Sequence, residues 1–208
     1  MSSVNNKVVL IGYSGHAFVA ADIFHRNEIL IAGYCDAIVK ENNPFGLTYF
    51  GNYNSNEAKA IMKKCSFFIA IGNNQIRSQI FKNLSDFQPI NAQDPSAIVS
   101  KTSTLGPGVM IGAGVKINAF ASIGTGVICN TGAIIEHECC IGDFVHLAPG
   151  SVLCGNVSIG ENSFIGANAV IKQGVKIGKN VTIGAGSVVL KDIDDNCTLA
   201  GNPAKILK

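Results

Sequence analysis

The chain has 208 residues, a formal net charge of +2, 47% hydrophobic residues and 14% charged residues. Because it also lacks a run of basic residues, this balance gives no electrostatic case for binding nucleic acid or a membrane surface. The longest apolar runs, Val8–Ile11 and Phe67–Ile71, are too short to cross a bilayer.

The cysteines and the N-terminus indicate where the protein works. Its seven cysteines are an odd number without CxxC spacing, which argues against a disulfide framework. No basic segment followed by an apolar stretch and a cleavage site is visible near the N-terminus. We therefore expect a cytoplasmic protein with reduced thiols.

The first predicted element is a buried strand over residues 7–11, which leads through a glycine-bearing turn into a helical pattern over 17–24. Ser14, Gly15 and His16 lie in that turn. A helix N-terminus presents free backbone N–H groups, so the turn predicts an anion-binding site. The full GxGxxG fingerprint is absent, and a nicotinamide cofactor is therefore not supported.

Two further strands follow. Residues 29–34 predict a strand that ends at Asp36, and residues 67–71 predict another, which Gly72 separates from a helix over 75–84. The alternation of strands and helices predicts a small parallel α/β sheet, whose ligands bind at the carboxyl ends of the strands. The turn after the first strand, Asp36 and Gly72 all fall there, although the glycines could serve only to turn the chain.

Beyond Pro95, which marks the expected boundary between domains over 1–94 and 95–208, the chain repeats with a period of six. Every sixth residue from Val99 to Val189 is Ile, Leu or Val, except Cys129, and glycine often follows it. This period fits neither a helix nor a plain alternation, and hexapeptide repeats are typical of a parallel β-helix. An ordinary β-sandwich would not hold one six-residue phase over so many strands.

Most residues outside the inward positions of the repeats are small or polar, and Asn130, His137, Glu138 and His146 stand out among them. A neutral imidazole can accept a proton near pH 7, and an adjacent carboxylate can orient it. We therefore expect His137 to be a general base that Glu138 orients, with both histidines facing outward onto the surface. The alternative is a solvated histidine in a charged turn.

The spacing of the two histidines bears on assembly. If three hexads make one coil of a triangular prism, His137 and His146 lie half a coil apart, on different sides of the prism. A site that uses both histidines would then need two subunits. We expect an active site at a subunit interface, with a cyclic homotrimer as the closed arrangement.

Metal binding by His137, Cys139, Cys140 and His146 is the competing interpretation. Adjacent cysteines point to opposite faces of an extended chain, which is poor ligand geometry. Glu138 has the wrong charge to stabilise a thiolate. We therefore expect neither a metal site nor a catalytic cysteine.

Four segments carry a resemblance to a known family: GYSGH (12–16), FFIAIGNNQIR (67–77), IIEHECCIGDFVH (134–146) and GNPAK (201–205). With the repeats, they resemble bacterial hexapeptide acyltransferases of the bacillosamine and sialic acid type, over essentially the whole chain. The resemblance implies a small Rossmann-like α/β domain that binds a nucleotide sugar, followed by a left-handed parallel β-helix of hexapeptide repeats.

The resemblance also assigns roles to residues. It implies that His137 is the catalytic base and that Glu138 raises its basicity. It implies contacts to acetyl-CoA at His146, Gly155, Ala167 and Ala185, and a nucleotide-sugar pocket at Ser14, Gly15, His16, Asp36 and Gly72, with Asn130 near the reactive end of the sugar. Two departures stand out: Asp36 is followed by Ala37 where relatives can have a second acid, and Gln93-Asp94-Pro95 stands where many relatives have Ile-His-Pro.

The implied activity is direct transfer of acetyl from acetyl-CoA to the 4-amino group of a UDP-linked 4-amino-4,6-dideoxy sugar. GDP-perosamine N-acetylation and sialic acid O-acetylation are the alternatives within the family. A non-catalytic trimer that only binds a nucleotide sugar fits less well with the intact His137–Glu138 pair. A serine acetyltransferase-like enzyme would leave the N-terminal domain unexplained.

Overall fold

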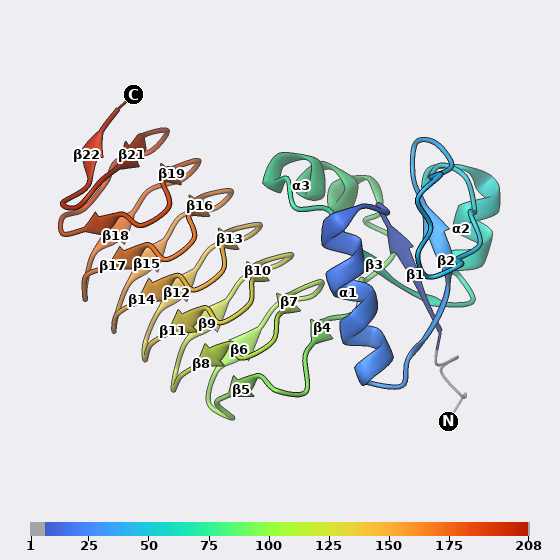
Figure 1. The fold of residues 1–208 in the computed structure, drawn as a ribbon, viewed down its shortest axis with the longest axis horizontal. Coiled ribbons are helices and arrows are strands. Elements are labelled where there is room, and N and C mark those ends of the chain that lie inside the picture. Colours follow the sequence, from blue (N-terminus) through green and yellow to red (C-terminus); the bar gives the residue numbers. More distant parts are fainter. Residues whose placement is uncertain (1–6, 208) are drawn as a thin grey trace.

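The structure is a computed structural model that describes residues 7–207. A small α/β domain lies beside a long β-helix (Figure 1). Strands and helices alternate in the α/β domain, in the order β1 (Lys7–Ile11), α1 (Gly15–Arg26), β2 (Leu30–Cys35), α2 (Asn56–Met62), β3 (Ser66–Ile69) and α3 (Asn74–Asn83).

The three strands form one parallel sheet in the order β2-β1-β3, which confirms the predicted α/β unit. Apolar residues of β1 are fully buried on both faces of the sheet, as a central parallel strand requires. Helix α1 begins at Gly15, two residues before the predicted start, because Ser14 already occupies the N-cap position. The carboxyl ends of all three strands lie at one edge.

Three sheets form the faces of the β-helix, and the chain visits them in turn (Figure 1). Their strands pair in parallel, except that the last two strands of the first sheet, β21 and β22, are antiparallel. Face 1 contains β4 (Ala92–Gln93), β7 (Met110–Ile111), β10 (Ile128–Cys129), β13 (His146–Leu147), β16 (Phe164–Ile165), β19 (Thr182–Ile183), β21 (Thr198–Ala200) and β22 (Lys205–Ile206). Face 2 contains β5 (Ile98–Val99), β8 (Lys116–Ile117), β11 (Ile134–Ile135), β14 (Val152–Leu153), β17 (Val170–Ile171) and β20 (Val188–Val189). Face 3 contains β6 (Thr104–Leu105), β9 (Ser122–Ile123), β12 (Cys140–Ile141), β15 (Ser158–Ile159) and β18 (Lys176–Ile177).

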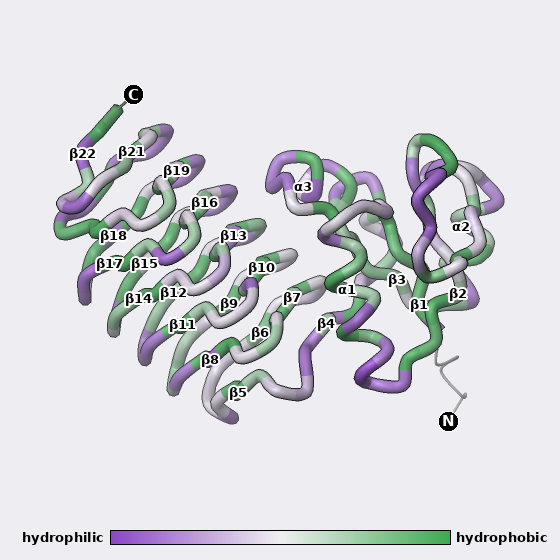
Figure 2. The backbone as a smooth tube through the Cα atoms, in the orientation of Figure 1, coloured by the Kyte–Doolittle hydropathy of each residue, from purple (hydrophilic) through white to green (hydrophobic). Residues whose placement is uncertain are grey.

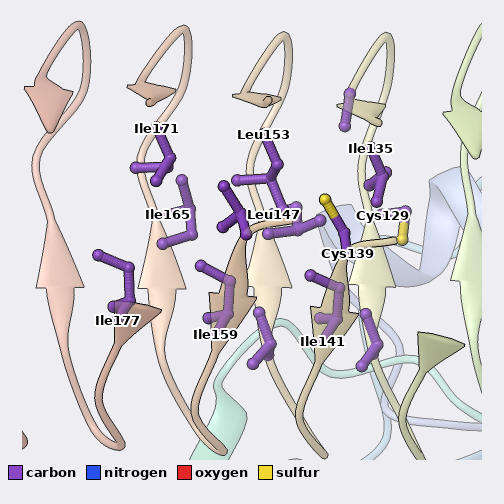
Figure 3. Close-up of a cluster of buried hydrophobic side chains, with 14 of the residues drawn as sticks. Cys129, Ile135, Cys139, Ile141, Leu147, Leu153, Ile159, Ile165, Ile171 and Ile177 are labelled. Carbon is purple, nitrogen blue, oxygen red and sulfur yellow. The ribbon is translucent and has the colours of Figure 1, made fainter. Parts of the chain in front are cut away.

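Each coil has eighteen residues, as the sequence predicts: Ile128 pairs with His146, and Cys129 pairs with Leu147. The sixth-position aliphatics point inward from all three faces and stack into one buried column (Figure 3). Hydrophobic and hydrophilic stretches alternate around each coil (Figure 2). Burial of this column along the coils is the main source of stability of the β-helix.

The backbone conformation at the corners of the β-helix also repeats every six residues. We name them by the faces they join: corner 1–2, corner 2–3 and corner 3–1. From Gly108 to Gly186, every sixth residue has a positive φ, and it is Gly or Asn except at Phe120, Glu138 and Phe144. Gly and Asn adopt this left-handed conformation at the lowest steric cost.

The α/β domain packs against face 1. The outward side chains of Met110 and Ile128 are buried in the same apolar cluster as Val8 and Leu10 of β1. The first strand of the β-helix, β4, begins two residues before the expected domain boundary. Among residues 7–207, no helix is both long enough and apolar enough to span a membrane.

Candidate active site

His137 and Glu138 lie together at corner 2–3, in the turn that follows β11. His137 Nδ1 lies 3.0 Å from Glu138 Oε2, so the ring donates this hydrogen bond when Nδ1 carries the proton. Glu138 has a φ of 61°, and its N–H donates to the Ala119 carbonyl of the preceding coil. Both side chains are more than half exposed, which confirms the expected surface position of His137. The turn thus brings together two neighbouring side chains that an extended strand would separate.

Gly155 occupies the same corner one coil later and packs against the His137 ring. A Cβ atom at Gly155 would lie 2.5 Å from Cε1 and Nε2 of His137. The Asn156 N–H also donates to the His137 carbonyl, at 2.8 Å. Only glycine leaves room for the imidazole in this position.

A second cluster lies between the α/β domain and face 1, and it contains His16, Gly72, Asn130 and His146. His146 Nε2 is 3.3 Å from Asn130 Nδ2, and its Nδ1 is 3.4 Å from the Gly72 carbonyl oxygen. The centroids of the His16 and His146 rings are 5.9 Å apart. Four residues from distant parts of the sequence are therefore assembled by the contact between the two domains.

The expected surface position of His146 is wrong. Its side chain does point away from the interior of the β-helix, as the alternation predicts, but the α/β domain and Phe164 cover it. Only 9% of His146 remains exposed. His146 therefore lies with the residues expected to bind the sugar rather than beside His137.

Both histidines of this cluster have a lowered pKa. Burial, with the nearby Arg77 charge, lowers the pKa of His16 to about 4 and that of His146 to about 4. Both rings are consequently neutral at pH 7. His16 Nε2 is buried without a hydrogen-bond partner among the described residues. A buried polar atom in this state is free to bind a ligand.

Arg77 of α3 is the buried charge behind this effect, and its side chain is 1% exposed. Its guanidinium donates to the Gly126 and Phe144 carbonyls of the β-helix and to the Ile71 and Gly72 carbonyls of the α/β domain. None of its partners among the described residues is a carboxylate, and burial lowers its pKa to about 9. Arg77 fastens the two domains together and leaves an unbalanced positive charge beside the cluster.

The start of α1 has the features predicted for an anion site. Ser14 is the N-cap but makes no side-chain capping hydrogen bond, and Ser14 and Gly15 are exposed. The N–H groups of the first turn therefore face outward. Asp36, by contrast, accepts hydrogen bonds from the Tyr13 and Ala37 N–H groups and pairs with Lys40 at 3.2 Å. Asp36 thus holds the loops at this edge in addition to any contact with a ligand.

Two concave regions lie on the α/β domain. A cleft of about 430 Å³ opens beside the second cluster, lined by Gly72, Asn73, Asn74, Gln75, Asn162 and Phe164. A larger groove of about 850 Å³ lies between α2 and the start of β3, at the opposite end of the strands. The larger groove contains none of the predicted site residues, so the smaller cleft is the relevant one.

The remaining predicted residues are divided between corners. Ala167 and Ala185 lie on corner 1–2 in adjacent coils, and the Gly186 N–H donates to the Ala167 carbonyl. Gly155 lies on corner 2–3 with His137. The residues expected to contact acetyl-CoA are therefore not adjacent within one chain.

The cysteines lie both inside the β-helix and on the surface. Cys139 occupies an inward position, as predicted, and burial raises the pKa of its thiol to about 11. All seven cysteines are free thiols. Within residues 7–207, no cluster of three or more His, Cys, Asp or Glu side chains could hold a metal ion.

Sequence reasoning missed two residues of the site. Arg77 lies inside the segment FFIAIGNNQIR, but an arginine one turn into a helix carries no signal of burial. Phe164 covers His146 from the neighbouring strand β16. Its signal was available, because an aromatic side chain in an outward position of a β-helix indicates a covering element.

Comparisons with known proteins find relatives of both domains. Residues 7–84 match the PglD N-terminal domain, and residues 156–191 match the hexapeptide repeat of succinyl-transferase. A histidine-to-asparagine variant of perosamine N-acetyltransferase from Caulobacter crescentus, in complex with CoA and GDP-perosamine, is 38% identical; the match covers 97% of both chains with a TM-score of 0.91. The acetyltransferase domain of PglB from Neisseria gonorrhoeae, in complex with acetyl coenzyme A, is 34% identical over 98% of this chain and 100% of that one, with a TM-score of 0.89.

Curated relatives match in part. UDP-N-acetylbacillosamine N-acetyltransferase from Bacillus subtilis is 37% identical over 110 residues, which cover 50% of each protein. The uncharacterized protein L142 of Acanthamoeba polyphaga mimivirus is 35% identical over 121 residues, 24% of its length. The chain thus spans half or less of the length of these two relatives. The two structural matches, in contrast, extend over nearly the whole chain, and they show that it belongs to the family of hexapeptide-repeat sugar N-acetyltransferases with a PglD-type N-terminal domain.

Proposed function

We propose that this protein transfers the acetyl group of acetyl-CoA to the amino group of a nucleotide-linked amino sugar. The observation that carries the proposal is the His137–Glu138 hydrogen bond at an exposed corner. A carboxylate on Nδ1 leaves the lone pair of Nε2 available to accept a proton from an approaching amine. The relatives support the substrate class, since the perosamine enzyme binds CoA and GDP-perosamine.

The reaction needs no covalent enzyme intermediate. The sugar amine attacks the thioester carbonyl while His137 Nε2 takes a proton from the nitrogen. The tetrahedral intermediate then collapses, the C–S bond breaks, and the imidazolium returns the proton to the departing thiolate. The backbone N–H of Gly155, beside the His137 ring, can donate a hydrogen bond to the oxyanion.

We propose that the active site forms between copies of the chain in a cyclic homotrimer. The proposed base lies on corner 2–3, whereas His146 lies on face 1, Asn130 at corner 1–2 and His16 on α1 of the α/β domain. Ala167 and Ala185 lie at corner 1–2, whereas Gly155 lies at corner 2–3. Two copies that place corner 2–3 of one beside the contact between face 1 and the α/β domain of the other would unite both sets.

The sugar we propose is a UDP-linked 4-amino-4,6-dideoxy sugar, in line with the match to the bacillosamine enzyme. A GDP-linked amino sugar is the second candidate, favoured by the longer match to the perosamine enzyme. The α1 N-terminus, the unpartnered His16 Nε2 and the unbalanced Arg77 charge support an anionic group of the nucleotide at the α/β domain.

Release of CoA thiol tests the proposal directly. Purified protein is given acetyl-CoA with a UDP-4-amino-4,6-dideoxy sugar, GDP-perosamine, sialic acid or serine, and each reaction is repeated with His137→Ala. We expect turnover of a nucleotide amino sugar that the variant loses. Turnover of sialic acid or serine alone would contradict the substrate class, and no turnover with any acceptor would favour a binding protein.

A further inference from the structure

Three corner positions with a positive φ carry a residue other than glycine or asparagine. Glycine or asparagine fills this position at nearly every corner from Gly108 to Gly186, because larger side chains are disfavoured there. A residue that breaks the rule must be retained for another reason. The three exceptions are Phe120, Glu138 and Phe144.

Two of the exceptions have a visible partner. Phe144 packs edge-on against Phe81, with ring centroids 5.5 Å apart, and so joins the β-helix to the α/β domain. Glu138 holds the His137 ring. Phe144 supplies an aromatic contact and Glu138 supplies a negative charge beside the imidazole, and neither glycine nor asparagine provides either of these.

Phe120 has no such partner within the described chain. Its φ is 61°, its side chain is among the most exposed apolar groups at 68%, and it makes no ring–ring contact among residues 7–207. Its backbone is nevertheless fixed, because its N–H donates to Thr102 Oγ1 at 3.2 Å. An exposed aromatic residue held in a disfavoured backbone conformation points to a contact with another molecule.

The position of Phe120 identifies that contact. It lies on corner 2–3, eighteen residues before Glu138, and the Glu138 N–H donates to the carbonyl of its neighbour Ala119. Adjacent coils are about 4.8 Å apart, so Phe120 lies one coil before the His137–Glu138 pair at the same corner. Gly155, which lacks a side chain, borders the pair on the other side.

We infer that Phe120 is a specificity-determining residue that packs against the apolar side of the acceptor sugar and favours a methyl group at C6. The inference rests on the proposed function. In that function the acyl donor lies on the Gly155 side of His137, which leaves the Phe120 side for the acceptor. An aromatic face offers apolar contact to a 6-methyl group but no hydrogen bond to a 6-hydroxyl group.

The test compares Phe120→Asn and Phe120→Tyr with the wild type on two acceptors that differ only at C6, one with methyl and one with hydroxymethyl. Asparagine suits the left-handed conformation, so the variant should unfold at the same or a higher temperature. We expect kcat/KM for the methyl acceptor to fall about tenfold in Phe120→Asn, with the preference over the hydroxymethyl acceptor lost. The KM for acetyl-CoA should not change, and Phe120→Tyr should keep most of the preference. Asn180→Gly, at the equivalent position of corner 3–1, is the matched control.

The outcomes separate the inference from the proposed function. If the wild type acts on nucleotide amino sugars and Phe120→Asn keeps both its kcat/KM and its preference, the inference is wrong and the function stands. A loss of activity that coincides with dissociation of the oligomer in light scattering would also overturn it, because Phe120 would then serve assembly. A wild type without activity on any nucleotide amino sugar would overturn both.

Discussion

The chain contains two histidine sites that differ in almost every physical respect. At corner 2–3, His137 is exposed and hydrogen-bonded to a carboxylate. Between the domains, His16 and His146 are largely buried, neutral and close to the Arg77 guanidinium, which bonds to carbonyl groups but to no carboxylate among the described residues. The first environment suits a base that must receive a proton from a substrate. The second suits recognition of an anion, because it combines neutral donors with an excess positive charge.

The two sites also differ in what holds them. The His137 site is built from one turn and the same corner of the neighbouring coils, so the regular repeat alone brings its residues together. The second site depends on the contact between two domains and on Arg77, which bonds to both. Changes at corner 2–3 should therefore affect chemistry and spare stability, whereas changes at the domain contact should affect stability and binding.

The largest expected effect is on chemistry at corner 2–3. His137→Ala should lower kcat by roughly 10²–10⁴-fold, the usual contribution of a general base, while nucleotide-sugar affinity stays near that of the wild type. Glu138→Gln should cause a smaller loss, and Glu136→Gln, a neighbouring acid, should cause none. Steady-state kinetics with titration calorimetry measure both quantities. Wild-type turnover by His137→Ala would exclude it as the base.

The next effect is on the domain contact. Arg77→Met leaves several carbonyl acceptors without a donor and should lower the free energy of unfolding by roughly 3–5 kcal/mol. Arg26→Met removes an ion pair between the half-exposed Arg26 and the buried Asp94 at the same contact. Because Asp94 keeps its two hydrogen bonds from Ser96, we expect a smaller loss than for Arg77→Met. Urea denaturation followed by circular dichroism compares the two variants. Equal effects would show that Arg77 does not hold the domains together.

The pH dependence should report on the buried histidines. Their pKa is about 4 in the fold and 6.5 in the unfolded chain, so the unfolded state binds more protons between these values. The stabilising contribution is complete above pH 6.5 and is lost as the pH falls towards 4, by up to roughly 3 kcal/mol for each histidine. Replacing both His16 and His146 by Asn should flatten this slope. A slope that persists in the double variant would assign it to other groups.

The smallest expected effect comes from displacing the His137 ring without removing it. Gly155→Ala places a methyl group where the His137 ring now lies and should displace the exposed ring without unfolding the corner. We expect kcat to fall about tenfold with little change in thermal stability, as for a misplaced catalytic group. Asn156→Gly, one residue later, serves as the control. An unchanged kcat would mean that the ring need not occupy its present position.

The sequence predicts most of the fold because the repeat is local and regular. The six-residue phase, the eighteen-residue coil and the order of strands and helices all follow from apolar spacing. The His137–Glu138 pair was predictable for the same reason, since both residues lie in one turn.

The domain contact could not be predicted, because it depends on how two separate units pack. Nothing near His146 in the sequence shows that a distant domain covers it, and nothing near Arg77 shows that its partners lie at Gly126 and Phe144. The outward apolar residues Met110 and Ile128 were the available signal that face 1 is covered. Even that signal identifies a covered face without saying which element covers it.

We propose that the two sites act together only when they come from different copies of the chain, and a mixture of two inactive variants can show whether they do. His137→Ala removes the base, and Gly15→Glu places an acid at the α1 N-terminus, where an added Cβ atom meets no neighbouring atom within 4 Å. The two variants are unfolded and refolded together, with each refolded alone as the control. We predict that the mixture regains a substantial share of wild-type CoA release, because one copy supplies His137 and the other supplies an intact α/β domain. A mixture of confirmed hetero-oligomers that stays as inactive as either variant alone would contradict the account.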